Sequence, residues 1–199
     1  METAPGQSAS PEIKSPHLQA LLALVDSITE AARVFLQGLS AEQLTWKPDA
    51  QTWSIAECFD HLIVIDRLYQ DKLHEAVLQG RDKRTLATKP FRPGFLGRIF
   101  IDTLKPNSPR KIKTFKIFRP RHHYTNSPAV IAAFIEKQND LSDLLRKADA
   151  LDLNRNRISS PVSPLLRFSI GECLTFLIYH QQRHLQQARR LSQSANFPA

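Results

Sequence analysis

The sequence predicts an all-α protein, a four-helix bundle with a long basic crossover connection between its second and third helices. Apolar residues recur at spacings of three and four over four long segments, as on the inner face of a helix. Two of these segments open with the pattern Ser-x-x-Glu, which is typical of a capped helix start. Only six glycines occur in 199 residues. A chain of this length can bury a substantial core.

The first helix is expected over residues 17–37, ending before Gly38. A linker with two tryptophans follows, and these side chains are expected to cover the end of the bundle. The second helix begins at the capping box of residues 54–57, where the hydroxyl of Ser54 accepts from an otherwise unpaired backbone amide. This helix is expected to end at Gly80.

The connection covers residues 81–127 and is interrupted repeatedly by proline. A short helix is expected over residues 95–104, and residues 113–118 are expected to be extended. Short loops make neighbouring helices antiparallel, whereas a connection of this length allows the second and third helices to run parallel.

The third helix is expected over residues 128–148, with Ser127 as its cap and proline in its first turn. The next linker, over residues 153–166, contains two prolines and polar residues. The fourth helix starts at a second capping box, residues 169–172, and is expected to continue to about residue 192.

The expected domain organisation is a disordered tail over residues 1–15, a single domain over residues 16–193 and a C-terminal tail over residues 194–199. No apolar run approaches the roughly 18 residues that a membrane span needs. The first residues lack a secretory signal, so Cys58 and Cys173 are expected to be reduced and the protein to be cytoplasmic.

The net charge of +8 is unevenly distributed. Residues 81–127 hold 13 lysines and arginines against two acids, a formal charge of +11. Such a segment can attract nucleic acid, an anionic lipid surface or an acidic small substrate. It can equally be a solvated loop whose side-chain stems cover apolar surface. The sequence leaves both interpretations open.

Three histidines lie on the apolar tracks of their helices. His180 and His184 are one turn apart in the fourth helix, and His61 is on the inner track of the second. If these helices are antiparallel, all three rings reach a similar depth. Three imidazoles directed at one interior point would hold a metal ion and leave coordination positions open. A hydrogen-bonded buried pair and a partly exposed helix end remain the alternatives.

Neighbouring polar residues have simpler explanations. Glu57 and Glu172 are accounted for by their capping boxes, and Cys58 by its place as a small buried residue one turn from the histidine of this helix. Asp60 and Asp66 are expected to point away from the histidine face, and either could orient a ring only through a neighbour.

Three further residues are candidates for substrate binding. Arg183 lies between the two histidines of the fourth helix and could bind a substrate carboxylate at the mouth of a pocket. His122 and His123 lie in the basic connection and could contact a phosphate or form part of a lid, although an exposed pair is the default expectation.

The chain resembles the DinB/YfiT-like superfamily of helical proteins over residues 15–193. The segments that carry the resemblance are Trp53–Glu57, Phe59–Leu62, Phe118–Pro120 and Tyr179–Leu185. The resemblance implies an up-down-down-up bundle with a divalent metal held by His61, His180 and His184. Nickel or zinc is the implied metal, with iron or manganese as alternatives. The basic segment departs from the family pattern, so substrate roles transfer poorly.

The resulting hypothesis is a metal-dependent transferase or hydrolase that activates a thiol or water for a small-molecule substrate, for instance an anionic thiol. The alternative is a nucleic-acid or anionic-surface binding protein that uses residues 81–127. A structural metal protein without turnover is a third, less favoured interpretation. A homodimer through an exposed helix face is compatible with all three.

Overall fold

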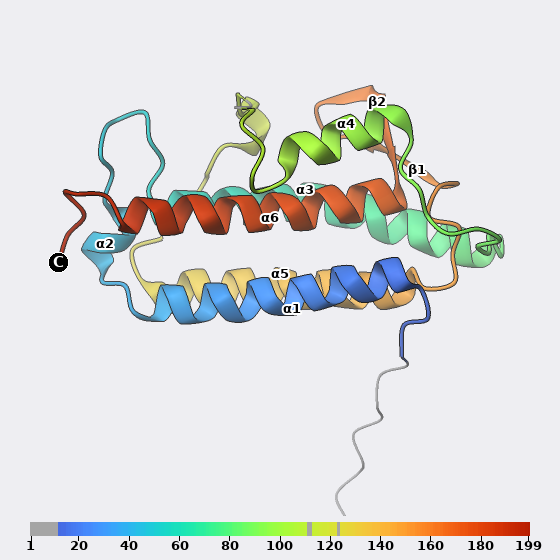
Figure 1. Cartoon of the computed structure of the whole chain (residues 1–199), viewed down its shortest axis with the longest axis horizontal. Helices are drawn as coiled ribbons and strands as arrows, with labels where there is room; N and C mark the ends of the chain where they lie inside the picture. The colour runs from blue at the N-terminus through green and yellow to red at the C-terminus, as the bar shows by residue number, and fades with distance from the viewer. Residues whose placement is uncertain (1–11, 111–112, 123) are drawn as a thin grey trace, which may run out of the picture.

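A computed structural model describes residues 12–110, 113–122 and 124–199 (Figure 1). Residues 1–11 of the tail predicted over residues 1–15, and the candidate His123, lie outside the described residues. In chain order the elements are α1 (Pro16–Gln37), α2 (Ala41–Thr45), α3 (Ile55–Asp82), α4 (Phe95–Leu104), the 3-10 helix η1 (Lys116–Phe118), α5 (Ser127–Lys147), β1 (Arg157–Ser160), β2 (Ser163–Ser169) and α6 (Ile170–Ser192).

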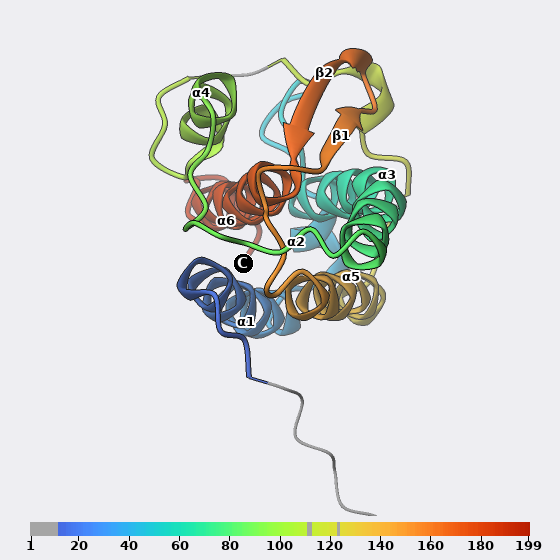
Figure 2. The same cartoon turned by 90° about the vertical axis from the view of Figure 1, so that its right-hand side faces the viewer.

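Four long helices lie side by side and enclose the core. α1 packs against α5 and α6, and α3 packs against the same two helices, as the end-on view shows (Figure 2). α3 and α5, which the long connection joins, run in one direction, and α1 and α6 run in the other (Figure 1). The three histidines therefore come from two antiparallel neighbours, α3 and α6.

The helices form where the sequence predicts them because apolar spacing and capping agree. The inner face of α1 buries residues at steps of three and four, namely Leu18, Leu21, Val25, Ile28, Ala32 and Leu36. Both predicted capping boxes are present. The amide of Glu57 donates to the Ser54 hydroxyl at 3.1 Å, and the amide of Glu172 donates to the Ser169 hydroxyl at 3.2 Å.

The class is predominantly helical with a small sheet, and not all-α. The predicted linker over residues 153–166 contains β1 and the first part of β2, which form an antiparallel hairpin. Ile158 and Phe168 face one another across the hairpin and are both buried. The strands are too short for an alternating pattern to stand out, and contacts with α3 and α6 hold them in place.

Several boundaries also differ from expectation. α3 continues through Gly80, which lies so close to Asn156 that an added Cβ would be 2.7 Å from its side-chain nitrogen. Asn126, and not Ser127, caps α5, because its side chain accepts from the amide of Ala129 at 2.9 Å. Residues 113–118 end in the 3-10 helix η1 instead of being extended throughout.

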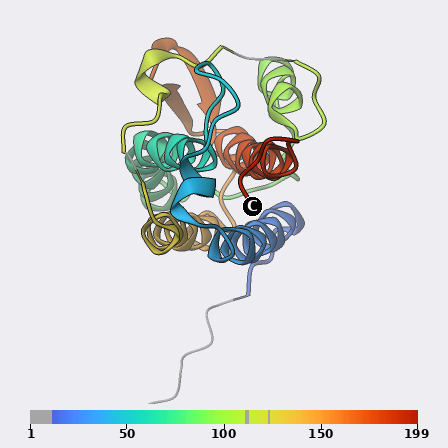
Figure 3. The same cartoon turned by 90° about the vertical axis from the view of Figure 1, so that its left-hand side faces the viewer.

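The short helix α2 was not expected from the sequence. It lies across one end of the four long helices (Figure 3). There Trp46 packs edge-on against Phe197, with ring centroids 5.5 Å apart. The C-terminal residues are therefore packed against this end of the molecule.

The long connection forms a layer over α3 and α6 together with the hairpin (Figures 2 and 3). Phe100 of α4 stacks on Phe168 at 4.8 Å and meets Phe176 edge-on at 5.0 Å. At the start of α4, the amide of Gly94 donates to Glu172 at 2.9 Å. This layer roofs the part of α3 and α6 that carries the histidines. Within the described residues, no helix combines the length and apolar character needed to cross a membrane.

Candidate metal centre

His61, His180 and His184 meet in the interior, as the sequence predicts for residues on the inner tracks of α3 and α6. The ring of His61 lies 5.1 Å from that of His180 and 4.7 Å from that of His184, measured between centroids. One ring nitrogen from each histidine lies within 4.8 Å of the others. All three side chains are buried. They form the group that could hold a metal ion.

The tautomer of His61 follows from its hydrogen bond. Its Nδ1 lies 2.6 Å from the carbonyl oxygen of Phe118. A carbonyl oxygen only accepts, so Nδ1 carries the proton and donates. The lone pair of Nε2 is therefore available on the side of the other two rings, which is the arrangement that metal-binding histidines commonly show.

His180 and His184 approach each other through their Nε2 atoms, which are 3.0 Å apart. Their positions one turn apart on α6 impose this proximity. The Nδ1 atom of His184 is buried and has no hydrogen-bond partner among the described residues. The two Nε2 atoms can share one proton in this hydrogen bond, whereas the unpaired buried Nδ1 of His184 is costly.

Burial keeps these imidazoles neutral. It lowers the pKa of His61 to about 4, although the Phe118 carbonyl and the Asp60 carboxylate oppose this shift. Burial also lowers the pKa of His180 and that of His184 well below the ordinary value, and in both cases His61 and Arg183 add to the effect. Neutral imidazole is the form that binds a metal ion.

Asp60 acts through a neighbouring segment that the sequence did not identify. It points away from the histidine face, as predicted, but it faces the connection. Its Oδ2 accepts from the amides of Arg121 and His122, the latter at 2.7 Å. These contacts fix the segment that carries Phe118, and so Asp60 acts on His61 through the backbone. No pattern around residue 60 could have indicated which distant segment would pack there.

Trp53 is a second residue of the site whose role the sequence did not indicate. Its ring lies 4.7 Å from that of His61 and 6.0 Å from that of His184. It was expected only to cover the end of the bundle. Its position directly before the Ser54 cap was the available signal, because the cap fixes where the preceding residue enters α3.

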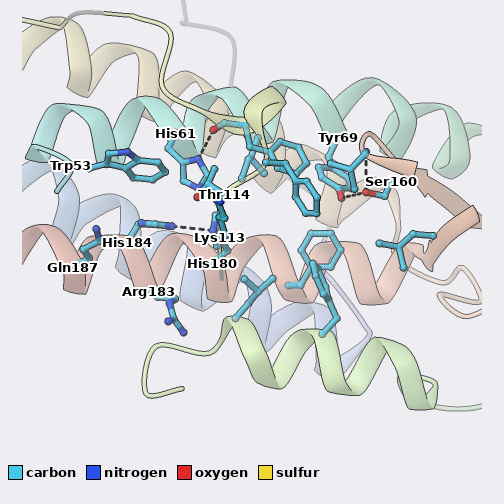
Figure 4. Close-up of a pocket in the computed structure, with 18 of the residues that line it drawn as sticks. Trp53, His61, Tyr69, Lys113, Thr114, Ser160, His180, Arg183, His184 and Gln187 are labelled. Atoms are coloured by element: carbon cyan, nitrogen blue, oxygen red, sulfur yellow. Dashed lines mark hydrogen bonds between the residues drawn. The ribbon is translucent and has the colours of Figure 1, made fainter. Parts of the chain in front are cut away.

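The histidines open onto a cavity of about 590 Å³ between α3, α6 and the overlying connection (Figure 4). Figure 4 shows Trp53 and His184 at one end of this cavity and Tyr69 with Ser160 at the other. The lining residues are Gln51, Thr52, Trp53, His61, Ile65, Tyr69, Phe100, Leu104, Lys113, Thr114, Phe115, Phe118, Ser160, Val162, Leu166, Phe176, His180, Arg183, His184, Gln187 and Arg190.

Arg183 lines this cavity, but its guanidinium also holds the connection. Nη1 donates to the carbonyls of Thr103, Lys105 and Ser108 at 3.1–3.3 Å, and Nη2 donates to that of Arg110 at 2.7 Å. These bonds leave little capacity for a substrate carboxylate.

The other residues considered lie outside the histidine group. His122 is exposed and does not line the cavity. Cys58 is fully buried, and burial raises the pKa of its thiol to about 12. Glu57 caps α3 and pairs with Lys47 at 2.9 Å. Glu172 caps α6 in addition to its bond with the start of α4.

Asp66 of α3 links this helix to α6 through Gln181, the residue that follows His180. Its Oδ2 accepts from the Gln181 side chain at 2.9 Å. Burial raises the pKa of Asp66 to about 7, although Gln181 and Lys137 oppose this shift. This carboxyl group is not directed at the histidines and belongs to the packing of the two helices.

The helical fold and the buried histidine group define the class of protein. The chain belongs to the DinB superfamily, whose model matches residues 18–188. The chain is similar to the uncharacterized protein YuaE of Bacillus subtilis (strain 168). The two are 26% identical over 158 residues, which cover 79% of this chain and 88% of YuaE. No solved structure matches the chain significantly.

Proposed function

We propose that this protein is a metal-dependent enzyme of the transferase or hydrolase type, in which His61, His180 and His184 hold one divalent cation. The single observation that carries the proposal is the convergence of three buried, neutral imidazoles on one point at the end of a large cavity. Within the proposal, the four long helices are the up-down-down-up bundle of a single domain over residues 16–193.

The donor set fits a first-row divalent metal. Two nitrogens that each lie about 2.0–2.1 Å from one tetrahedral zinc ion would be roughly 3.3 Å apart. The separation of the His180 and His184 Nε2 atoms is 3.0 Å. The group contains imidazoles and no carboxylate or thiolate. Such a set suits zinc or nickel, and iron or manganese are the less favoured alternatives.

A bound divalent cation would lower the pKa of a coordinated water or thiol. Three protein donors leave room for that ligand. The chain supplies the rest: the Phe118 carbonyl fixes the His61 ring, Trp53 covers one side of the group, and the cavity positions the substrate beside it. The implied substrate is a small molecule, and a low-molecular-weight thiol fits the resemblance to superfamily members.

The direct test is metal content. Protein purified without chelator and then dialysed against zinc or nickel should retain one equivalent per chain, and His180→Ala should lose it. His74→Ala is the matched control, because His74 lies on α3 away from the cavity. Retention of the same metal content by His180→Ala would refute the proposed site.

The second candidate function is binding to an anionic lipid surface through α4. Phe95, Leu96 and Ile99 project outward and are 79%, 69% and 42% exposed, next to the exposed Arg92 and Arg98. Outward apolar side chains favour a lipid surface over nucleic acid, because a phosphate backbone offers them no apolar contact. Cosedimentation with phosphatidylglycerol vesicles at low salt, reduced by Leu96→Glu, would support this function. Equal sedimentation with neutral vesicles would exclude it.

A further inference from the structure

The cavity beside the histidines has two chemically different ends. Near Trp53 and His184 the lining is polar or cationic, with Gln187 and Arg190 following on α6. At the opposite end, the polar side-chain atoms are the hydroxyls of Tyr69 and Ser160, which are hydrogen bonded to each other at 3.2 Å. A molecule that fills the cavity must therefore be polar at one end and apolar along most of its length.

The walls toward the Tyr69 end are aromatic. The ring of Phe176 meets that of Tyr69 edge-on at 5.3 Å and that of Phe100 at 5.0 Å. Phe118 stacks against Tyr69 at 6.4 Å, and Leu166 of the hairpin closes the wall. Protein interiors are normally packed without such voids, and volumes of about 300–1,000 Å³ are typical of ligand pockets. The aromatic walls indicate that the occupant of this space is apolar.

The charge of the lining indicates the sign of the ligand's polar end, which lies beside the histidines. Lys113, Arg183 and Arg190 contribute three cations, and no aspartate or glutamate is present among the described lining residues. Arg183 donates its hydrogen bonds to backbone carbonyls, which are neutral, so its positive charge is not cancelled. A cationic head would be repelled here, and an anionic head would be attracted.

We propose that the cavity selects an amphiphilic anion, with its anionic head beside the histidines and its alkyl or aryl body extending to Tyr69 and Ser160. This inference rests on the proposed function, because it names the substrate class of the same site. The specificity-determining residues are those of the apolar walls, which the resemblance to the superfamily does not assign. The connection and the hairpin, which roof the cavity, thus determine what the site accepts.

The test is calorimetric titration of the zinc-loaded full chain with butyrate, hexanoate, octanoate and decanoate below their micelle concentrations. Each added methylene should tighten binding about fourfold until the cavity is full. The corresponding alkylamines should not bind. Phenylacetate and phenylbutyrate distinguish an aryl body from an alkyl body. Affinity that is independent of chain length, or amines that bind as tightly as acids, would overturn the inference.

A variant that fills the end of the cavity at Tyr69 and Ser160 tests where the apolar body of the ligand lies. Val162 lies in the turn between β1 and β2, and its amide donates to Ser160 at the apolar end. Val162→Trp should abolish the gain from octanoate to decanoate while butyrate binding is retained. Val34→Trp is the control, since Val34 is 59% exposed and does not line the cavity. An unchanged chain-length dependence in Val162→Trp would contradict the assignment.

The zinc content of the unmodified chain, measured together with the same titrations on its metal-free form, separates the two proposals. If no zinc binds to the unmodified chain but affinity still rises with chain length, the metal-dependent function fails and the amphiphile inference stands. If zinc binds at one equivalent and affinity does not change with chain length, the metal site stands and the inference fails.

Discussion

The Nδ1 atom of His61 donates to the carbonyl oxygen of Phe118 over 2.6 Å, which joins a helix of the core to the connection that covers it. The residue next to this histidine, Asp60, holds the same connection by accepting from two of its amides. Consecutive residues of α3 thus bind one segment, and the orientation of the imidazole depends on where that segment lies.

Asp60→Ala should weaken metal binding although Asp60 touches no metal-binding atom. Loss of the carboxylate leaves the amides of Arg121 and His122 unpaired, and the Phe118 carbonyl loses its fixed position. Loss of such outer partners typically costs about 10–100-fold in metal affinity. Competition against a chelator measures the dissociation constant. Asp71→Ala, an exposed aspartate on α3, is the control. Equal affinity for Asp60→Ala and unmodified protein would show that the segment does not orient His61.

The metal-free protein should lose stability as the pH falls from about 6.5 to about 4. The pKa of His61 is about 4 in the folded chain and 6.5 in its unperturbed state. The unfolded chain therefore takes up protons first, and the free energy of unfolding falls with pH over this window. Urea denaturation of unmodified protein and His61→Leu in chelator, at several pH values, measures the difference.

Asp66 changes the free energy of unfolding with pH in the opposite direction to His61. Both the unmodified protein and His61→Leu contain Asp66, so its contribution cancels in the difference between them. Its raised pKa of about 7 stabilises the folded chain at low pH, and this stability is lost as the pH rises through 7. His61→Leu should show a smaller loss of stability on acidification than the unmodified protein. Parallel pH profiles would mean that His61 does not stay neutral in the folded chain.

Gly97→Ala should release α4 from α6. A Cβ at residue 97 would lie 2.0 Å from Oε1 and 2.7 Å from Cγ of Glu172. That carboxylate is held by the amides of Ser169 and Gly94 and is buried, so it cannot move aside cheaply. Overpacking of this kind costs about 1–3 kcal/mol. Thermal unfolding measures it, with Gly38→Ala as control because no atom lies within 4 Å of a Cβ there. Equal midpoints for the two variants would contradict the packing.

Arg183→Ala should loosen the connection. Its guanidinium bonds to carbonyls of residues 103, 105, 108 and 110, and no smaller side chain can replace this set. Chymotrypsin should cleave after the exposed Phe115 several-fold faster in this variant, while Arg189→Ala should match the unmodified protein. Unchanged cleavage in Arg183→Ala would show that Arg183 does not hold the connection. It would favour the role predicted from the sequence, in which this residue binds a substrate carboxylate.

The sequence by itself determined the long helices and two of their starts. Apolar spacing over residues 17–37 and the capping boxes at Ser54 and Ser169 are local signals, and each acts within one or two turns of the chain. The same locality placed His180 and His184 together, because a helix fixes residues four apart on one face. The position of His61 beside them required only that α3 and α6 be antiparallel neighbours.

The tertiary structure alone decided what surrounds the histidines. The partner of the His61 ring is 57 residues away, and the two amides that donate hydrogen bonds to Asp60 are 61 and 62 residues away. Likewise the sequence predicts a helix end at Gly80, yet α3 continues through it. Asn156 and Leu151 occupy the space that a side chain at residue 80 would take, so this glycine serves close packing. A short hairpin or a backbone carbonyl carries no signature in its own sequence, because its position is set by long-range packing.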